Sequence, residues 1–219
     1  QKMSKRLGNA VDPFETMKKF GADATRWYMI TNAPPWDNLK FDTEGITEVQ
    51  RKYFRALHNS YSFFALYANL DGFKHSEASI PLNKRPEIDQ WIISRLNSLI
   101  KEVEEAFNVY EPTRAGRAIQ DFVVDELSNW YVRLCRRRFW KGDYSGDKIA
   151  AYQTLYKCLI TVAKLSAPIA PFYSEQLFSD LNSVTTLEGE DSVHIAAWPN
   201  VDEAFIDESL EKRMALAQT

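Results

Sequence analysis

The sequence predicts a mainly all-α protein folded as an antiparallel helical bundle. Apolar residues recur at three- and four-residue steps along several long segments, which is typical of helices that bury one face. Prolines, glycines and short polar stretches separate these segments, so successive helices should turn back on one another. One exception is expected near residues 193–198, where the pattern allows a short strand or extended segment after a polar loop.

The first residues predict a loop followed by two short helices. Residues 1–11 are polar and contain the glycine and asparagine typical of a loop. Asp12 can cap the next helix and Pro13 fits its first position, and that helix should end at the next glycine. A second helix is expected over residues 22–32, before two prolines break the chain. We therefore expect a loop-plus-helix module over residues 1–45.

The remaining residues, 46–219, should form the helical bundle. Helical patterns cover residues 43–70, 87–110, 113–140, 147–168 and 172–181, and a last one covers residues 207–219. Asp147 is placed to cap the fourth of these helices. The chain begins with Gln1 rather than methionine, and its last helical pattern meets no stop signal, so we expect a piece of a longer protein.

The composition is that of an ordinary globular protein. The chain has 219 residues, of which 45% are hydrophobic and 26% charged, enough to bury a core without metals or disulfides. The formal net charge is −3, so a nucleic-acid partner would have to bind a local basic patch. Cys135 and Cys158 lie in apolar helical patterns without metal-site spacing, which predicts reduced, packed thiols and no metal site. With no signal peptide and no apolar run long enough to span a bilayer, we expect a cytoplasmic monomer without membrane contact.

A lysine-rich loop near the first residue is one candidate for chemistry. Lys2-Met3-Ser4-Lys5 places two ammonium groups three residues apart, with a hydroxyl between them. Such a loop can close on a polyphosphate, and cations that tighten on the departing pyrophosphate would accelerate adenylyl transfer. The alternative is a solvated basic turn, which the lysine pair alone favours because short motifs often occur by chance.

A second candidate is a basic and aromatic cluster near the end of the 113–140 helix. Its members are Arg133, Arg136, Arg137, Arg138 and Lys141, interleaved with Tyr131, Phe139 and Trp140. Arginine can pair with phosphate through two hydrogen bonds, and exposed aromatic rings can stack on unpaired bases. Alternatively, the arginines pair with acidic faces of neighbouring helices and the aromatic residues belong to the core, as we expect for Trp130. The residues alone favour neither reading. Acidic side chains able to act as such partners are Glu102, Glu104, Glu105, Asp121, Asp125 and Glu126.

Longer stretches around both candidates resemble a known family. KMSKRLGNAVDPFE, followed by KKFGADATRWYM, resembles the KMSKS signature of class I aminoacyl-tRNA synthetases and the helices after it. NWYVRL followed by RRRFW, together with WDNLKF and YSFFALY, is similar to the isoleucyl-tRNA synthetase family over essentially the whole chain. Arg6 replaces the last serine of the signature, which resembles the variant in the eukaryotic-type branch of that family.

The resemblance implies a fold, partners and site residues. The fold would be the class I anticodon-binding bundle, and the chain a tRNA-binding fragment of isoleucine–tRNA ligase. That enzyme forms isoleucyl-adenylate from isoleucine and ATP, with magnesium, and passes the acyl group to isoleucine-accepting tRNA. Lys5 would contact ATP, assisted by Lys2 and Ser4, and residues 12–45 would link the loop to the bundle and touch the inside of the tRNA. The RNA-binding residues would be Arg133, Arg136, Arg137, Arg138, Trp140 and Lys141.

Other features of the sequence limit what this chain should be able to do on its own. The His-x-Gly-His segment of class I enzymes is absent, and so are the catalytic and editing domains. The fragment alone should therefore be inactive and hold no tightly bound cofactor. One alternative is a helical protein-interaction bundle without an RNA role, which leaves the lysine loop and the arginine cluster unexplained. Another is a separate nucleotide-binding enzyme, but no glycine-rich phosphate cradle accompanies the lysines.

Overall fold

The computed structural model describes residues 10–141 and 143–218, and every regular element in these ranges is a helix. This confirms the all-α prediction. None of the helices in the described ranges has the length and apolar character needed to cross a membrane. In chain order the elements are α1 (Pro13–Phe20), α2 (Ala22–Asn32), α3 (Thr43–Val49), η2 (Gln50–Phe54), α4 (Arg55–Asp71), η3 (Leu82–Lys84), α5 (Glu87–Asn108), α6 (Pro112–Asp121), η4 (Phe122–Val132), α7 (Arg133–Trp140), α8 (Gly146–Ser166), α9 (Pro171–Thr185), η5 (Glu203–Phe205) and α10 (Glu208–Gln218).

Two long helices contain a π-helical section. α3, η2 and α4 form one continuous helix, because the residues at both junctions keep right-handed helical angles. α6, η4 and α7 are continuous for the same reason, and η4 is π-helical over its whole length. The long helices predicted at residues 43–70 and 113–140 are therefore confirmed, and the π-helical sections are a local change of winding within them.

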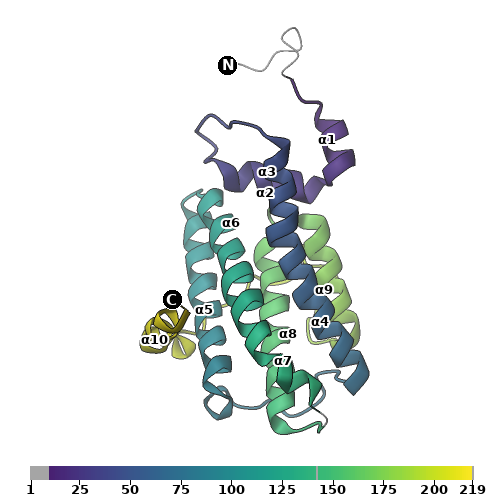
Figure 1. The fold of residues 1–219 in the computed structure, drawn as a ribbon, viewed down its shortest axis with the longest axis vertical. Helices are drawn as coiled ribbons and strands as arrows, with labels where there is room; N and C mark the ends of the chain where they lie inside the picture. The colour runs from purple at the N-terminus through teal and green to yellow at the C-terminus, as the bar shows by residue number, and fades with distance from the viewer. Residues whose placement is uncertain (1–9, 142, 219) are drawn as a thin grey trace.

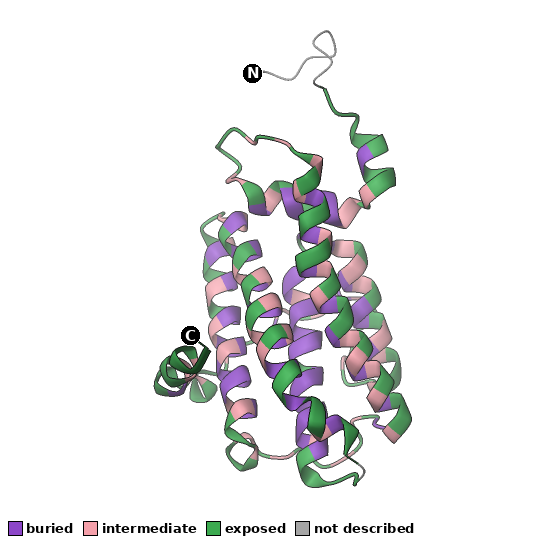
Figure 2. Ribbon diagram, in the orientation of Figure 1, coloured by how far each residue is buried: buried purple, intermediate pink, exposed green. Residues whose placement is uncertain are grey.

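In the part of the chain that the structure describes, five long segments make the bundle, namely α4, α5, α6–η4–α7, α8 and α9; Figure 1 shows their arrangement. α5, α6–η4–α7, α8 and α9 alternate in direction, as predicted for an antiparallel bundle, and α4 packs against both η4 and α8. α4 runs in the same direction as its neighbour η4 (Figure 1). In agreement with this, its C-terminal residue Asp71 pairs with Lys148 at the start of α8. α8 lies in the middle, and most of its residues are buried (Figure 2).

The N-terminal helices are seated on one end of this bundle. Trp27 of α2 is fully buried and stacks on Tyr53, with ring centroids 4.0 Å apart. The last carbonyls of α2 lack helical partners, and α6 supplies them. Thr113 Oγ1 donates to Ile30 O at 2.6 Å, and Arg117 Nε donates to the next carbonyl at 2.8 Å. Side chains of the bundle therefore cap α2.

Local capping rules succeed at α1 and fail at α8. Asp12 Oδ1 accepts the backbone N–H groups of Phe14 and Glu15 at 2.8 and 3.1 Å, as predicted. Asp147 does not cap α8: Ser145 occupies the N-cap, without a side-chain hydrogen bond, and Asp147 lies in the first turn. The reason is a stronger partner, because the Asp147 carboxylate pairs with an arginine of α7.

The segment at residues 193–198 is not a strand. Its first residues turn, and the N–H groups of Ile195 and Ala196 both point to the carbonyl of Ser192. Val193 is buried, and its N–H donates to the Glu175 carboxylate at 2.9 Å. The expected strand is therefore wrong: the first residues of the segment turn, and a side chain of α9, rather than a neighbouring strand, accepts the Val193 N–H.

Candidate nucleic-acid interface

The two candidate sites differ in what the structure describes. Lys2, Ser4 and Lys5 lie outside the described residues, so the role expected for them stays a prediction. The basic cluster lies on α7 and its C-terminal turn, and all its members are described. The candidate interface therefore lies on α7.

α7 separates its residues into a buried and an exposed side. Cys135 and Phe139, four residues apart, are each 1% exposed and face the core. Apart from Arg138, the residues between and beside them point outward, as the 3.6-residue period requires. The exposed cations are Arg133, Arg136, Arg137 and Lys141. Trp140 is 55% exposed and belongs to the same outer side.

These exposed cations have no acidic partner among the described residues. No ion pair or side-chain hydrogen bond involves Arg136, Arg137 or Lys141 in residues 10–141 and 143–218. The Arg133 guanidinium lies over the Trp130 ring, 6.0 Å from its centroid, a cation–π arrangement that leaves its charge unneutralised.

Several of the expected acidic partners are engaged elsewhere. Glu126 pairs with Arg95 at 2.9 Å, and Glu105 pairs with Arg114 at 3.1 Å. Glu102 also lies near the Arg114 guanidinium, 3.6 Å away. For the four exposed cations of α7, the internal-pairing alternative is therefore not what the structure shows.

Arg138 is the exception in the arginine run. Its side chain is 14% exposed, and its two terminal nitrogens bind the two oxygens of Asp89 at 2.6 and 2.8 Å. The same guanidinium contacts Asp147, whose carboxylate lies 2.9 Å away. For Arg138 the structure therefore shows the internal-pairing alternative, and its expected contact with RNA stays a prediction. Its partner Asp89 could not be found from the sequence, because an acidic residue in the first turn of a helix is ordinary.

The aromatic members of the cluster also divide. Tyr131 and Phe139 are buried, and the Tyr131 hydroxyl donates to Asp89 at 2.8 Å. Burial raises the pKa of Tyr131 well above its ordinary value, with the nearby Asp89 carboxylate adding to the effect. Trp130 packs partly buried against the core, as expected. Of these aromatic residues, Trp140 is therefore the one exposed enough to stack on a base.

An open cavity lies where α7 turns into α8. It has a volume of about 600 Å³. Its lining residues are Arg137, Arg138, Lys141, Asp143, Ser145 and Asp147. A phosphate that entered it would meet two unpaired cations, Arg137 and Lys141, and the carboxylate of Asp143 would oppose it. The site suits an anionic ligand held from the α7 side.

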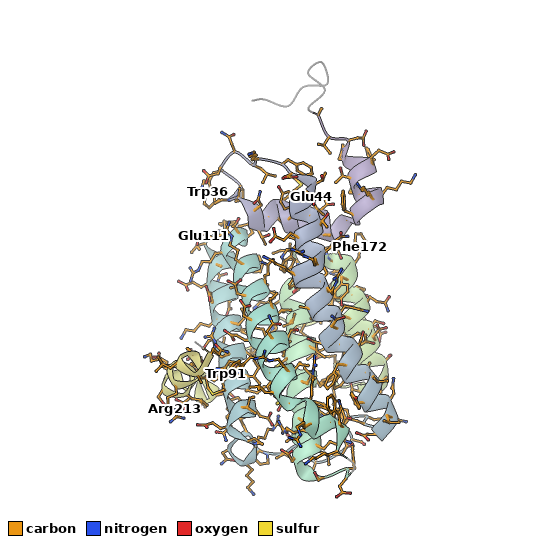
Figure 3. All side chains as sticks on the ribbon, in the orientation of Figure 1. Trp36, Glu44, Trp91, Glu111, Phe172 and Arg213 are labelled. Atoms are coloured by element: carbon orange, nitrogen blue, oxygen red, sulfur yellow. The ribbon has the colours of Figure 1, made fainter. Side chains whose placement is uncertain are left out.

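A second cavity, of about 450 Å³, offers no such cations. It lies at the other end of the bundle, where Trp36 and Glu111 are labelled in Figure 3. Its arginines are all bonded within the protein: Arg95 and Arg114 to glutamates, and Arg117 to the carbonyls that end α2. Between the two cavities, the one at α7 is therefore the better candidate for RNA phosphates.

Two protein families match separate parts of the chain. Residues 89–219 match the family described as the anticodon-binding domain of tRNA ligase. Residues 1–42 match the family of class I tRNA synthetases for I, L, M and V. The first match covers all but the first two residues of α5 and every later element through α10, including the whole of α7 and its cavity.

Individual relatives agree with these families. The chain is 69% identical to the isoleucine–tRNA ligase of Cytophaga hutchinsonii over 217 residues, which are 99% of this chain and 20% of that protein. Identity is 63% with the isoleucine–tRNA ligase of Bacteroides fragilis, over 99% of this chain and 19% of the relative. For the Thermus thermophilus enzyme it is 48%, over 98% of this chain and 20% of the relative. The chain thus spans about a fifth of the length of these relatives.

A solved structure has the same fold. It is the ternary complex of LeuRS with tRNA and LeuAMS from Agrobacterium radiobacter K84, with a TM-score of 0.65 and 21% identity. The similarity covers 94% of this chain and 23% of that one. At this identity the likeness concerns the fold alone. Because the match over residues 89–219 covers more than half of the chain, the chain belongs to the family of anticodon-binding domains of tRNA ligases.

Proposed function

We propose that this chain recognises the anticodon end of isoleucine-accepting tRNA, as part of an isoleucine–tRNA ligase. The observation that carries the proposal is the exposed side of α7, where Arg133, Arg136, Arg137 and Lys141 have no acidic partner in the described residues and Trp140 lies beside them. The isoleucine specificity rests on the relatives, which carry that name at up to 69% identity.

The chemistry of the α7 surface fits a single-stranded RNA loop. Guanidinium groups bind phosphates through charge-assisted hydrogen bonds, and each neutralised phosphate releases counterions, which makes the affinity depend on salt. An unstacked base can stack on the Trp140 ring, a contact worth about 1–3 kcal/mol. A duplex would hide its bases from that ring, so a loop uses the surface more fully.

The lysine loop has a separate role in this proposal. In the parent ligase, Lys2, Ser4 and Lys5 would meet ATP, and the lysines would stabilise charge on the departing pyrophosphate, with magnesium bound to the nucleotide. The match of residues 1–42 to the class I family supports this role. Residues 1–45 would then form the loop and stem-contact module, and residues 46–219 the anticodon-binding domain. The chain alone would form no isoleucyl-adenylate, and a pyrophosphate-exchange assay that detected activity would refute this.

The branch of the family is a finer part of the proposal. Arg6, in the position of the last serine of the KMSKS signature, supports the eukaryotic-type branch. The relatives compared above are bacterial proteins, so the proposal is that this branch includes them. A phylogenetic tree of ligases from both branches tests it. Grouping with the enzymes that keep serine at this position would contradict it.

We also propose that the chain acts in the cytoplasm as a monomer, bound to tRNA without a membrane. The site on α7 needs no second copy, since its cations and its stacking residue come from one helix. Light scattering of the purified chain, with and without tRNA, measures the stoichiometry. A stable dimer in the absence of tRNA would contradict the monomer.

A binding titration tests the RNA site. The chain is titrated with isoleucine tRNA and with a non-cognate tRNA at two salt concentrations. Arg133→Ala and Arg137→Ala should each weaken binding and lower the slope of log affinity against log salt by about 0.7–0.9. Lys212→Ala is the matched control, because Lys212 is an exposed cation on α10 that already pairs with Glu208.

The outcomes separate the alternatives. Loss of binding with the α7 variants but not with the control supports the anticodon-domain proposal. Binding that is equal for all variants places the RNA elsewhere. Absence of tRNA binding at low salt would favour a protein-interaction bundle.

A further inference from the structure

We propose that Arg138 is a positioning residue for the α7 surface. Its guanidinium bridges α5 and the first turn of α8, and this bridge, called the clamp below, fixes the turn between α7 and α8, called the corner. Arg137, Trp140 and Lys141 are thereby held in the arrangement that binds RNA. The inference rests on the proposed function of that surface. It assigns Arg138 a role different from that of its neighbours in the sequence, since Arg138 would shape the site without touching the ligand.

The geometry of the clamp uses the whole guanidinium. Arg138 Nη1 and Nη2 donate to the two carboxylate oxygens of Asp89, and Nε donates to Asp147 Oδ2 at 3.1 Å. Nη2 also donates to the backbone carbonyl of Asp147 at 2.9 Å, and Nη1 contacts the Cys135 sulfur at 3.6 Å. An arginine has five N–H groups, and these contacts involve all three of its nitrogens. Little hydrogen-bonding capacity is left for a phosphate.

One side of the clamp is anchored deep in the bundle. Asp89 is fully buried near the start of α5, and the Tyr131 hydroxyl donates to the same carboxylate. A buried carboxylate that lost its cation would be very unfavourable, so the pair with Arg138 resists opening. The pairing is bidentate, which fixes the direction of the guanidinium as well as its distance. Arg138 is therefore held rigidly relative to α5.

The other side of the clamp reaches the first turn of α8. Asp147 is the second residue of that helix, and both its side chain and its carbonyl accept from Arg138. Between the two helices the chain leaves the helical conformation at Lys141. Arg137, Lys141, Asp143 and Asp147 line the cavity together with Arg138. A shift of the corner would thus change the spacing of the cavity's charges.

The direct test compares two neighbouring carboxylates of that cavity. Asp147→Asn removes the charge partner of Arg138 at the α8 side, while the buried Asp89 pair keeps the fold. Asp143→Asn is the matched control, because Asp143 lines the same cavity and has no ion pair with Arg138 in the described residues. On electrostatics alone, both changes remove a negative charge beside a phosphate site and should strengthen RNA binding.

The positioning role predicts opposite results for the two variants. Asp147→Asn should weaken isoleucine tRNA binding, by about fivefold, whereas Asp143→Asn should tighten it. The effect of Arg137→Ala should also be smaller in the Asp147→Asn background, because a displaced Arg137 contributes less. A purely structural Arg138 would give no such coupling. If both variants tighten binding equally, the positioning role is overturned.

A second pair of variants separates positioning from stability. Arg138→Lys keeps the positive charge but loses the planar guanidinium that can bind a carboxylate through two hydrogen bonds. Arg95→Lys is the control, because it makes the same change in another arginine that binds two carboxylates, Glu126 and Glu211. Both should lower Tm, so binding is measured well below either transition. Only Arg138→Lys should weaken tRNA binding, with a smaller salt slope; equal affinities would overturn the inference. The proposed function fails separately, if Arg137→Ala has no effect on binding by the wild-type chain.

Discussion

Gly116 lies where the N-terminal helices cross the bundle, and its replacement by alanine should loosen that crossing. A Cβ at this position would stand 2.7 Å from Thr31 Cγ2 and 3.2 Å from Ile169 Cδ1. Ordinary van der Waals contact begins near 3.4 Å, so α2 would have to retreat by roughly 0.7 Å to relieve the closer overlap. Rotating Thr31 away is costly, because its hydroxyl donates to the Trp27 carbonyl at 2.8 Å.

Two opposing effects set the size of the change. Overpacking of this kind costs about 1–3 kcal/mol, and alanine gains up to about 1 kcal/mol over glycine in a helix. We therefore expect Gly116→Ala to lower the free energy of unfolding by about 1–2 kcal/mol. Urea unfolding followed by tryptophan fluorescence measures it, since Trp27 lies in the affected interface.

Two further variants make the test of Gly116 decisive. Gly146→Ala is the control, because nothing lies within 4 Å of a Cβ there, and it should be neutral or slightly stabilising. Thr31→Ser deletes the methyl group that the new Cβ meets and keeps the hydroxyl, so it should recover part of the loss in Gly116→Ala. A Gly116→Ala chain as stable as the wild type would refute the close approach of α2 and α6.

Three other predictions follow from buried and partly buried groups. Burial raises the pKa of Asp71, but hydrogen bonds from Lys148 and Tyr152 outweigh burial and lower this pKa overall. The ionised Asp71 carboxylate therefore stabilises the fold fully above its pKa in the unfolded chain, about 3.9. This stabilisation is lost as the pH falls through the lower pKa of Asp71 in the folded chain. Asp71→Asn should cost about 3 kcal/mol at pH 7 in urea unfolding, and less below about pH 4. The Cys135 and Cys158 thiols are buried, and burial raises the pKa of Cys135 to about 11, so iodoacetamide at pH 8 should label both in guanidinium and neither in the folded chain. Glu211→Ala removes one of the two carboxylates that accept from Arg95, the one that ties α10 to α5. It should speed tryptic cleavage within α10 without changing the bundle's helicity by circular dichroism.

The sequence predicts the helices better than it predicts what their side chains contact. Periodicity identifies the long helices at residues 43–70 and 113–140 because a buried stripe survives a change of winding such as η4. The cap at Asp12 is equally local, since donor and acceptor are two and three residues apart. Asp147 has the same local signal, but an arginine of another helix binds it. Local rules cannot weigh such a competitor.

The same limit explains the outcome for the arginine run. Three successive arginines look alike in the sequence, yet a helix turns each by about 100° from the last. Arg138 meets Asp89 of α5, whereas Arg136 and Arg137 face outward. Without the packing of α5 against η4, which brings Asp89 to Arg138, nothing distinguishes the three. The misassigned segment at residues 193–198 has a related cause, because its backbone partner is a distant glutamate.

The net charge of −3 does not argue against an RNA surface on α7. Many acidic groups are paired within the described residues, among them Glu126 with Arg95 and Glu105 with Arg114. The two opposite charges of such a pair largely cancel at a distance, and salt screens what remains beyond the Debye length, about 8 Å at physiological salt. The potential near α7 is therefore set by its own cations that lack a partner, with Asp143 opposing them. Acidic groups away from α7 are paired with other arginines, and Arg138 is kept inward by Asp89 and Asp147. Unpaired positive charge is therefore concentrated on one side of a single helix, even though the protein as a whole is acidic.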